Sequence, residues 1–437
     1  MKTAYAALPL LLTALAAGAC SSNESGESAE SQIDVARSSL SRDTSPTLEP
    51  AEAESFAADQ ATFAIDLYHA VAKEAPGDDV FLSPVSVSTA LAMTFAGARG
   101  ETRAEMQAAL AFNLPEERLH TAFNWLDLQL SSRGKDAVGK DGKPFRLNVV
   151  NSTWGQKGFG FEAPFLDTLA VSYGAGVNLL DFRSDAEGAR GVINDWVERK
   201  TEDRIKDLLP ERSLDERTRM VLVNAVYFNA GWEKKFVDGG TQPAPFTKLD
   251  GATAQVQMMT SGTTSRRYAA TDDYQAVEID YDGGEMAMLV VAPTSGTFAT
   301  FEASLTGAKV LDVLAGLEAR PVRLSVPKFK LEAGASLKAP LESLGMKRAF
   351  NDDEADLSGI STEAPLVVKD VIHKTFIEID ENGTEAAAAT AVIVGEPTSA
   401  PVDEPAVMTV DRPFLVAIVD RATKNLVFVG RILDPKL

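Results

Sequence analysis

The spacing of apolar residues changes once along this chain, from helical to strand-like, with no linker between the two parts. Phe56, Phe63 and Leu67 recur at the spacing of one helical face. Residues 371–379 instead alternate as a half-buried strand does. Helices early and strands late predict an α+β fold, and residues 56–437 are expected to form one structural unit. Further expected elements are helices from Ser86 and over Ile193–Pro210, and strands over 277–281 and 286–292.

The first twenty residues are similar to a bacterial secretory leader that ends in a lipid-attachment site. After a short positive start, Ala6 to Ala19 is almost wholly apolar. That run is too short for a membrane-spanning helix. The small residues before Cys20 resemble a lipobox, although Ala17 stands where the pattern prefers Leu. We expect residues 1–19 to be a signal peptide and Cys20 to carry a lipid; the alternative is cleavage by an ordinary signal peptidase.

Residues 20–55 are rich in Ser and Glu, contain no aromatic residue and have few apolar side chains. This composition predicts a disordered acidic tether. Because Cys20 is the only cysteine, no intrachain disulfide can form. The leader and the tether predict an exported protein that is anchored at the periplasmic or cell-surface face of a bacterial membrane, or secreted if the lipid is absent.

Charge and the short list of reactive side chains exclude several classes of function. With 42 Lys+Arg against 63 Asp+Glu the net charge is -21, which disfavours a nucleic-acid partner. The three histidines, His69, His120 and His373, form no zinc-like pattern. The chain has no nucleophile elbow, phosphate-binding glycine loop or dinucleotide fingerprint. We therefore expect no metal, no cofactor and no enzymatic activity.

Seven segments along the chain carry motifs that occur in the same order in one known family. The N-terminal one, residues 79–106, reads DVFLSPVSVSTALAMTFAGARGETRAEM. The others are residues 147–159, 221–236, 325–332, 344–360, 408–418 and 426–435. Together they resemble the serpin family of peptidase inhibitors, which commonly has Asn at the position of Asp79. The resemblance implies a helical N-terminal half and three β-sheets with a large central sheet A. It also implies an exposed reactive-centre loop at about residues 381–407.

This resemblance implies a suicide inhibitor that works as a monomer. A target serine peptidase cleaves the loop, forms a covalent acyl-enzyme and is trapped when the loop inserts into sheet A. The alternative is a non-inhibitory binding protein with the same fold.

The hinge at the start of the loop satisfies the sterics of strand insertion. Every second side chain of an inserted strand enters the buried face of the sheet, so those positions must be small and uncharged. The hinge begins at Glu381 and includes Gly383, and the side chains that follow alternate between the two faces. Glu385 would face outward, and the inward positions would be Thr384, Ala386, Ala388 and Thr390. No proline interrupts residues 382–396, so each amide there can join the sheet.

Other residues match two polar clusters of the family, and their roles are implied by the resemblance. The shutter, through which the strands of sheet A part, matches Ser83, Ser86, Asn224 and His373. The breach, where the loop first enters, matches Trp232, Lys328 and Glu381. An ion pair between Lys328 and Glu381 is expected there.

The bait bond is expected within the window formed by Pro397, Thr398, Ser399 and Ala400. The family's usual spacing from Glu381 gives Pro397–Thr398, and bonds followed by proline are poor substrates. The residues suit an elastase-, subtilisin- or chymotrypsin-like peptidase that prefers small side chains. No Arg or Lys lies between Glu381 and Arg412, so a trypsin-like target is not expected.

A modest basic cluster is interpreted as a solvated hairpin loop rather than a polyanion site: Arg133, Lys135, Lys140, Lys143 and Arg146.

Overall fold

Two β-sheets dominate the part of the chain that the structure, a computed structural model, describes: residues 33–139, 142–384 and 404–437. Sheet A has seven strands and lies within the unit Val35–Leu437. In spatial order they are β1 (Val35–Ala36), β4 (Val177–Leu180), β3 (Arg146–Gln156), β5 (Met220–Gly231), β14 (Gly383–Thr384), β13 (Ile372–Asp380) and β12 (Phe329–Ser336).

The second sheet has ten strands, nine of them in one hydrogen-bonded path and a tenth paired off that path, where the sequence resemblance implied two sheets. They join because β11 pairs with β8 along its first half and with β7 along its second. The strands are β2 (Val80–Leu82), β17 (Asn425–Ile432), β16 (Phe414–Asp420), β10 (Met286–Pro293), β9 (Tyr274–Asp280), β8 (Thr264–Ala270), β11 (Glu318–Pro327), β7 (Thr253–Thr260), β6 (Gln242–Thr247) and β15 (Ala406–Thr409), which pairs with β11.

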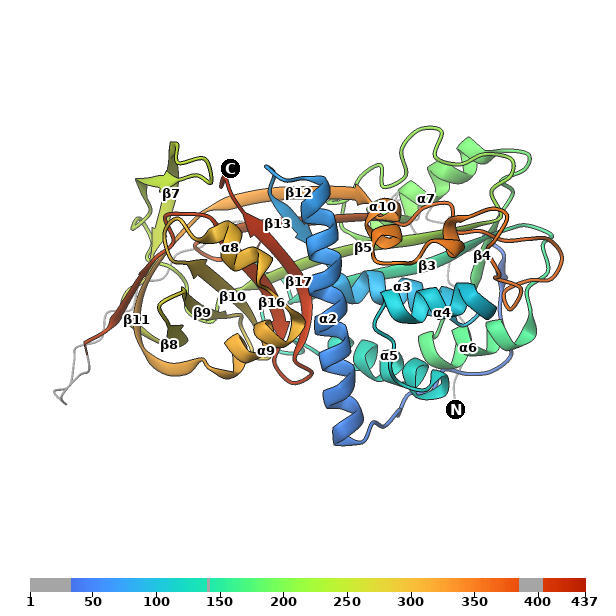
Figure 1. Ribbon diagram of the computed structural model, residues 1–437, viewed down its shortest axis with the longest axis horizontal. Coiled ribbons are helices and arrows are strands. Elements are labelled where there is room, and N and C mark those ends of the chain that lie inside the picture. Colours follow the sequence, from blue (N-terminus) through green and yellow to red (C-terminus); the bar gives the residue numbers. More distant parts are fainter. Residues whose placement is uncertain (1–32, 140–141, 385–403) are drawn as a thin grey trace, which may run out of the picture. The chain divides into compact units, whose positions relative to one another are not determined.

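The helices lie mainly in the first half of the chain, as expected for the α+β class. Figure 1 shows α3 lying against the long strands of sheet A, and α3 contacts both β3 and β5. The helices are α2 (Pro50–Glu74), α3 (Pro84–Phe95), α4 (Gly100–Ala109), α5 (Glu116–Ser131), α6 (Ala163–Tyr173), α7 (Ala186–Lys200), α8 (Phe298–Ala303), α9 (Gly307–Ala315), α10 (Lys338–Ser343) and the short 3-10 helix η1 (Arg348–Phe350).

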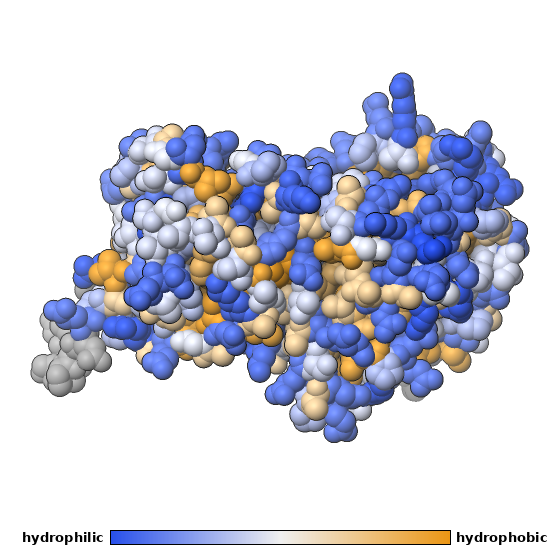
Figure 2. Space-filling view, viewed as in Figure 1, coloured by the Kyte–Doolittle hydropathy of each residue, from blue (hydrophilic) through white to orange (hydrophobic). Residues whose placement is uncertain are grey.

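The first two long helices have the burial that their sequences predict. In α2, Phe56, Phe63 and Leu67 are buried on one face. In α3 all residues but Thr89 are buried, which is typical of a helix that is apolar all round. Hydrophilic residues cover most of the face in Figure 2, and apolar residues show there in small, separated areas. No helix in the described ranges is long and apolar enough to cross a bilayer.

The tether predicted to extend to residue 55 is wrong over its last part, because residues 35–55 are part of the folded domain. Val35 and Ala36 form β1, which pairs with β4. Helix α2 begins at Pro50, where the Glu52 carboxylate accepts a hydrogen bond from the Glu49 backbone N–H. The low apolar content of this segment led to the tether prediction, because the contacts that hold the segment on the domain are made by polar side chains. Residues 20–32, with Cys20, lie outside the described residues.

The helix predicted over Ile193–Pro210 is wrong beyond Lys200. Helix α7 spans Ala186–Lys200, and the next turns are irregular. Glu202 and Asp203 adopt left-handed φ values of 50° and 62°, which a helix cannot continue through. The strands predicted at 277–281, 286–292 and 371–379 are present as β9, β10 and β13; β10 and β13 agree within one residue at each end, and β9 begins three residues earlier than predicted.

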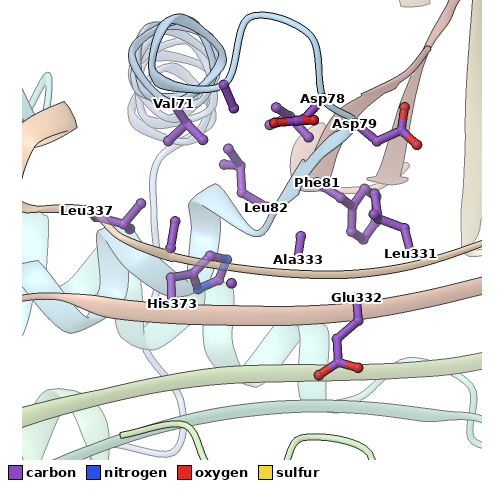
Figure 3. A pocket seen from close by; sticks show the side chains of 14 residues that line it. Val71, Asp78, Asp79, Phe81, Leu82, Leu331, Glu332, Ala333, Leu337 and His373 are labelled. Carbon is purple, nitrogen blue, oxygen red and sulfur yellow. The ribbon is translucent and has the colours of Figure 1, made fainter. Parts of the chain in front are cut away.

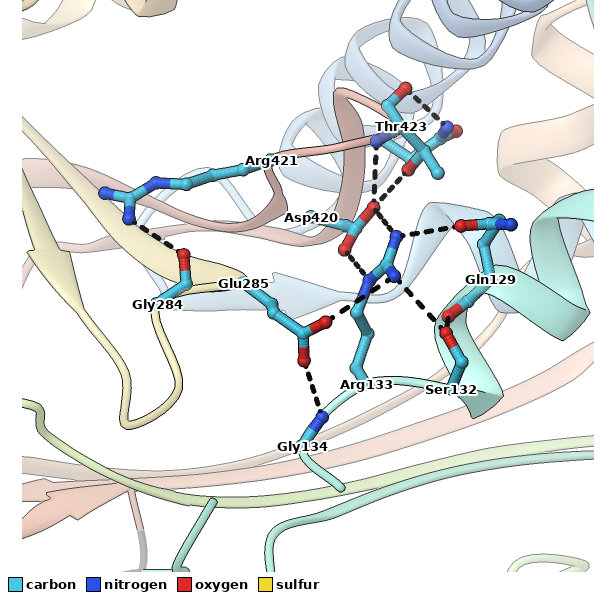
Figure 4. A network of polar contacts seen from close by, with 10 residues as sticks. Gln129, Ser132, Arg133, Gly134, Gly284, Glu285, Asp420, Arg421 and Thr423 are labelled. Carbon is cyan, nitrogen blue, oxygen red and sulfur yellow. Dashed lines mark hydrogen bonds and ion pairs between the residues drawn. The ribbon is translucent and has the colours of Figure 1, made fainter. Parts of the chain in front are cut away.

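Arg133 belongs to a buried polar network and not to a solvated basic loop (Figure 4). Its guanidinium pairs with Asp420 of β16 at 2.6 Å, and the two side chains are only 8% and 0% exposed. Asp420 also accepts hydrogen bonds from the backbone N–H and hydroxyl of Thr423. Lys135 and Lys143 of the same cluster are exposed, while Lys140 lies outside the described residues.

We predict that Arg133→Met destabilises the fold by about 3–5 kcal/mol, because it leaves the Asp420 carboxylate buried without its cation. Lys135→Met removes an exposed charge nearby and should change stability little. The denaturant midpoints of the two variants and the parent measure this difference. Equal midpoints for the two variants would contradict the structural role given to Arg133.

Candidate functional site: the opening of sheet A

Strands β5 and β13 are paired in the middle of sheet A and separated at one end. They pair in parallel from Ile372 opposite Val223 to Thr375 opposite Val226, and this pairing is here called the seam. Further along, β14 lies between them, with Thr384 opposite Ala230 of β5 and opposite Ile379 of β13. Sheet A is therefore closed at the seam and already admits two residues of the chain beyond it.

The geometry of β14 explains why its two residues are Gly and Thr. Gly383 has φ +154°, and a Cβ there would lie 2.2 Å from the Ala230 carbonyl oxygen, so only glycine fits. The Thr384 side chain points inward and is 1% exposed, as the alternation predicts. Its hydroxyl forms a hydrogen bond of 2.8 Å with the hydroxyl of buried Tyr281. The remaining hinge and bait positions lie outside the described residues: Glu385, Ala386, Ala388, Thr390, Pro397, Thr398, Ser399 and Ala400.

At the entrance beside β14, the structure brings together the residues expected at the breach. Lys328 Nζ lies 2.6 Å from the Glu381 carboxylate, with side chains 23% and 17% exposed. The Thr241 hydroxyl donates to the same carboxylate at 2.5 Å. Burial raises the pKa of the Glu381 carboxyl, but the hydrogen bonds from Lys328 and Thr241 outweigh this effect and lower the pKa below its ordinary value. Glu381 is therefore held as an anion at the start of the loop.

Trp232 ties the same stretch of chain to β5. Its backbone N–H donates to the Asn382 carbonyl and its indole N–H donates to the Asp380 carbonyl, both at 2.9 Å. The ring stacks on Tyr281 with centroids 4.7 Å apart. Tyr281 and Thr241 contribute to this site but were not singled out from the sequence, because neither lies in a polar pattern that marks it.

The shutter residues form one hydrogen-bonded cluster across the seam. His373 of β13 and Asn224 of β5 lie opposite each other, and His373 Nδ1 bonds to Asn224 Oδ1. His373 Nε2 accepts the backbone N–H of Ser83 at 2.9 Å. Nε2 must then be unprotonated, so Nδ1 carries the proton and donates it to Asn224. The Ser83 hydroxyl has no hydrogen-bond partner among the described residues.

Asn151 of β3 completes this cluster and was not predicted. Asn224 Nδ2 donates to Ser86 Oγ at 2.5 Å and to Asn151 Oδ1 at 2.7 Å. Asn151 lies directly opposite Asn224 in the pairing of β3 with β5. Side chains from three adjacent strands and from α3 are thus linked, and parting β5 from β13 breaks the bond between His373 and Asn224.

The shutter borders a cavity of about 260 Å³ between α2, β2 and β12 (Figure 3). His373 lines it together with Phe81 and Leu82, and the small side chains Ala333 and Ala335 of β12 leave it open. The shutter therefore borders free space on this side rather than close-packed side chains.

Burial also fixes the charge state of His373. Its complete burial lowers the pKa of the imidazole to about 3, so the ring is neutral at pH 7. A solvated imidazole titrates near pH 6.5, so a state that releases the ring takes up a proton that the closed state does not. The closed seam is therefore most stable above about pH 6.5 and loses stability as the pH falls toward 3.

The other histidines hold structural positions. His69 Nε2 bonds to the Glu302 carbonyl at 3.0 Å. His120 Nδ1 bonds to the Tyr173 hydroxyl at 2.8 Å, and burial lowers the pKa of His120 to about 4. Among the described residues no group of three or more His, Cys, Asp or Glu side chains is placed to hold a metal ion.

A model of the family described as serpin (serine protease inhibitor) matches residues 58–435. The chain belongs to the serpin family. An uncharacterized serpin-like protein of Thermococcus kodakarensis is 37% identical over 86% of this chain and 84% of its own length. The leukocyte elastase inhibitor of Homo sapiens is 34% identical over 85% of this chain and 97% of its own length. As a serpin, the chain is not an enzyme.

Solved serpin structures share the whole fold. The native state of tengpin, a thermophilic serpin, superposes with a TM-score of 0.78 at 27% identity, covering 92% of this chain and all of tengpin. Thyroxine-binding globulin in complex with thyroxine gives 0.76 at 29% identity, covering 87% of this chain and all of the globulin. Serpins therefore include a binding protein as well as inhibitors.

We predict that acid opens the shutter through His373. In the parent protein, the backbone amides of residues 372–375 should exchange with deuterium faster at pH 5 than at pH 7.5, after correction for the intrinsic exchange rate, because protonation favours the released ring by up to about 2 kcal/mol. His373→Gln should lose this acid acceleration. His120→Gln, a buried histidine on α5 away from the seam, should retain it. The same acid acceleration in all three proteins would contradict the assignment.

We predict that Lys328→Met loosens the breach and speeds spontaneous insertion of the uncut loop several-fold. The pair is partly exposed, so a loss of about 1 kcal/mol is expected. Lys330→Met, two residues along and exposed, is the matched control and should behave as the parent. Rates of conversion to an inactive form at one temperature give the comparison, and equal rates in all three proteins would exclude a restraining role for Lys328.

Proposed function

We propose that this serpin is an irreversible inhibitor of serine peptidases. The target peptidase cleaves the loop that follows Thr384, and the cleaved loop then inserts into sheet A. The observation that carries this proposal is β14, which lies between β5 and β13 in the register of a new central strand. The hinge has thus begun the pairing that insertion would extend, and the adjoining seam is the only part of β13 that pairs with β5 within the described residues.

The register of β14 supports the predicted inward positions. Gly383 and Thr384 pair with Gly231 and Ala230, so continuation of the strand would place Val394 opposite Met220, the first residue of β5. The next inward positions would be Ala386, Ala388 and Thr390, which are small and uncharged. About ten added backbone hydrogen bonds, at roughly 0.5–1.5 kcal/mol each, would release on the order of 10 kcal/mol. This is comparable to the stability of a domain.

The chemistry of trapping needs no catalytic group from the serpin. The peptidase serine hydroxyl would attack the bait carbonyl, the peptide bond would break, and the amine of the new C-terminal fragment would leave with the proton. The resulting ester would join the peptidase to the serpin. Insertion before water hydrolyses that ester would carry the peptidase along the sheet and distort its active site.

The target is proposed to be an elastase-, subtilisin- or chymotrypsin-like peptidase with a pocket for small side chains. The bait window from Pro397 to Ala400 contains no basic residue. Relatives at 34–35% identity are named leukocyte elastase inhibitors, in keeping with this preference. We further propose that the protein is exported as a monomer and held at a bacterial membrane through a lipid on Cys20.

Incubation with a panel of such peptidases, followed by denaturing electrophoresis, tests the proposal. A peptidase adduct that survives SDS is the expected result, and mass spectrometry of the released C-terminal peptide should place the cut between residues 397 and 400. Cleavage of the loop by every peptidase without any adduct would overturn the proposal and favour a binding protein of the kind represented by thyroxine-binding globulin.

We predict that Ala388→Arg converts inhibition into plain cleavage, because an inserted strand would bury the new charge in the sheet. Ala387→Arg places the same side chain one position away, where it should face outward, and should leave inhibition nearly intact. The number of serpin molecules consumed per peptidase inactivated measures the difference. Equal values for the two variants would contradict insertion in this register.

A further inference from the structure

The cavity beside the shutter has walls from two layers of the domain (Figure 3). One wall comes from the end of α2 and from β2, with Val71 and Phe81 among its side chains. The other comes from β12 and β13, with Leu331 and His373. Both ring nitrogens of His373 are already bonded within the shutter, so this side chain offers no further polar group to the cavity. The walls therefore suit an apolar body.

The size of the cavity limits what it can hold. Its volume is about 260 Å³. An engineered apolar cavity of about 150 Å³ binds benzene, whereas pockets for drug-sized ligands begin at about 300 Å³. The occupant that fits is therefore a molecule with one aromatic ring and a few further atoms.

The mouth of the cavity carries one negative charge without a counter-ion. Of the three acidic residues that line the cavity, Glu332 is paired with Lys374 at 2.8 Å. The Asp79 carboxylate accepts hydrogen bonds from two backbone N–H groups just after β17, at 2.5 and 3.2 Å. Asp78 is exposed, and its carboxylate has no ion pair or hydrogen bond with any described residue. No described Lys or Arg lines the cavity.

We propose that this cavity binds a small aromatic amine, with the ring in its apolar part and the ammonium group beside Asp78. The ammonium group supplies the missing counter-ion and stays at the mouth, where water still reaches it. The net charge of -21 draws cations toward the protein in general. This site stands apart from the inhibitory function proposed above.

The position of the ring gives binding an effect on the seam. A ring in the cavity contacts Leu82 of β2 on one side and Ala333 of β12 on the other. Strand β12 is paired with β13 over eight residues, so the ligand links β13 to the body of the domain next to the seam. A ligand that fits only this arrangement stabilises it. Bound amine should therefore hold the seam closed.

Titration with 2-phenylethylamine, followed by NMR of labelled histidine, tests the site. The chain has three histidines, so the ring signals of His373 can be assigned with His373→Gln. The amine should shift these signals with a dissociation constant of about 1 mM, as expected for a ligand of this size, and leave those of His69 and His120 in place. The neutral 2-phenylethanol and the anionic 3-phenylpropionate should bind several-fold more weakly.

Three variants separate the roles of charge and space. Asp78→Asn should lower the affinity for the amine several-fold and leave that for the alcohol unchanged. Glu74→Gln, an exposed acid at the end of α2 that does not line the cavity, is the matched control and should keep the preference for the amine. Ala333→Leu fills the cavity and should abolish binding of all three compounds. Unchanged His120 signals show that each variant is folded.

Deuterium exchange of the amides of residues 372–375 measures the effect on the seam. Saturating amine should slow this exchange several-fold in the parent and leave it unchanged in Ala333→Leu. Equal affinities of the amine and the alcohol for the parent, equal losses in Asp78→Asn and Glu74→Gln, or unshifted His373 signals would overturn the proposed site. Unchanged exchange at saturation would overturn its effect on the seam.

Discussion

The pairing of β5 with β13 is the constraint on which the rest of this structure depends. Four residues on each strand are paired, and beyond them β14 holds the strands apart. A sheet that is closed in the middle and open at one end has two alternative strand pairings. The strands can stay paired with each other, or each can pair with a new strand between them. Under the proposed insertion the second arrangement forms more backbone hydrogen bonds, so the first would persist only while something restrains the loop.

Two polar clusters supply that restraint in different ways. At the seam, His373 and Asn224 are joined by a hydrogen bond that cannot survive separation of the strands. At the entrance, Lys328 and Thr241 hold the Glu381 carboxylate, and Trp232 holds the carbonyls on either side of Glu381. The first cluster is fully buried and responds to protonation, whereas the second is partly exposed and depends on an ion pair. In the first cluster His373 bonds to the backbone N–H of Ser83 and to Asn224, and not to a serine hydroxyl.

The sequence predicted the features that follow from local pattern and missed those that depend on distant partners. Alternation along the hinge correctly turned Thr384 inward, and apolar spacing located α2, α3 and the long strands. Asn151 was missed because only its position opposite Asn224 gives it a role. Residues 35–49 were mistaken for tether because their anchors lie on α5, α6 and β4, more than eighty residues away along the chain. Helix α7 was extended too far because the left-handed turn at Glu202 and Asp203 occurs at residues that seldom adopt it.

Cleavage of the loop gives the most direct test of whether the loop can insert between β5 and β13. The protein is cut between residues 397 and 400 by a peptidase that releases it, and its thermal unfolding is compared with that of the intact chain. Insertion of ten residues between β5 and β13 predicts a large rise in the unfolding temperature. The new backbone hydrogen bonds would add on the order of 10 kcal/mol to the free energy of unfolding, and the only strand pairing lost would be the seam. An unfolding temperature that is unchanged or lower after cleavage would contradict the account.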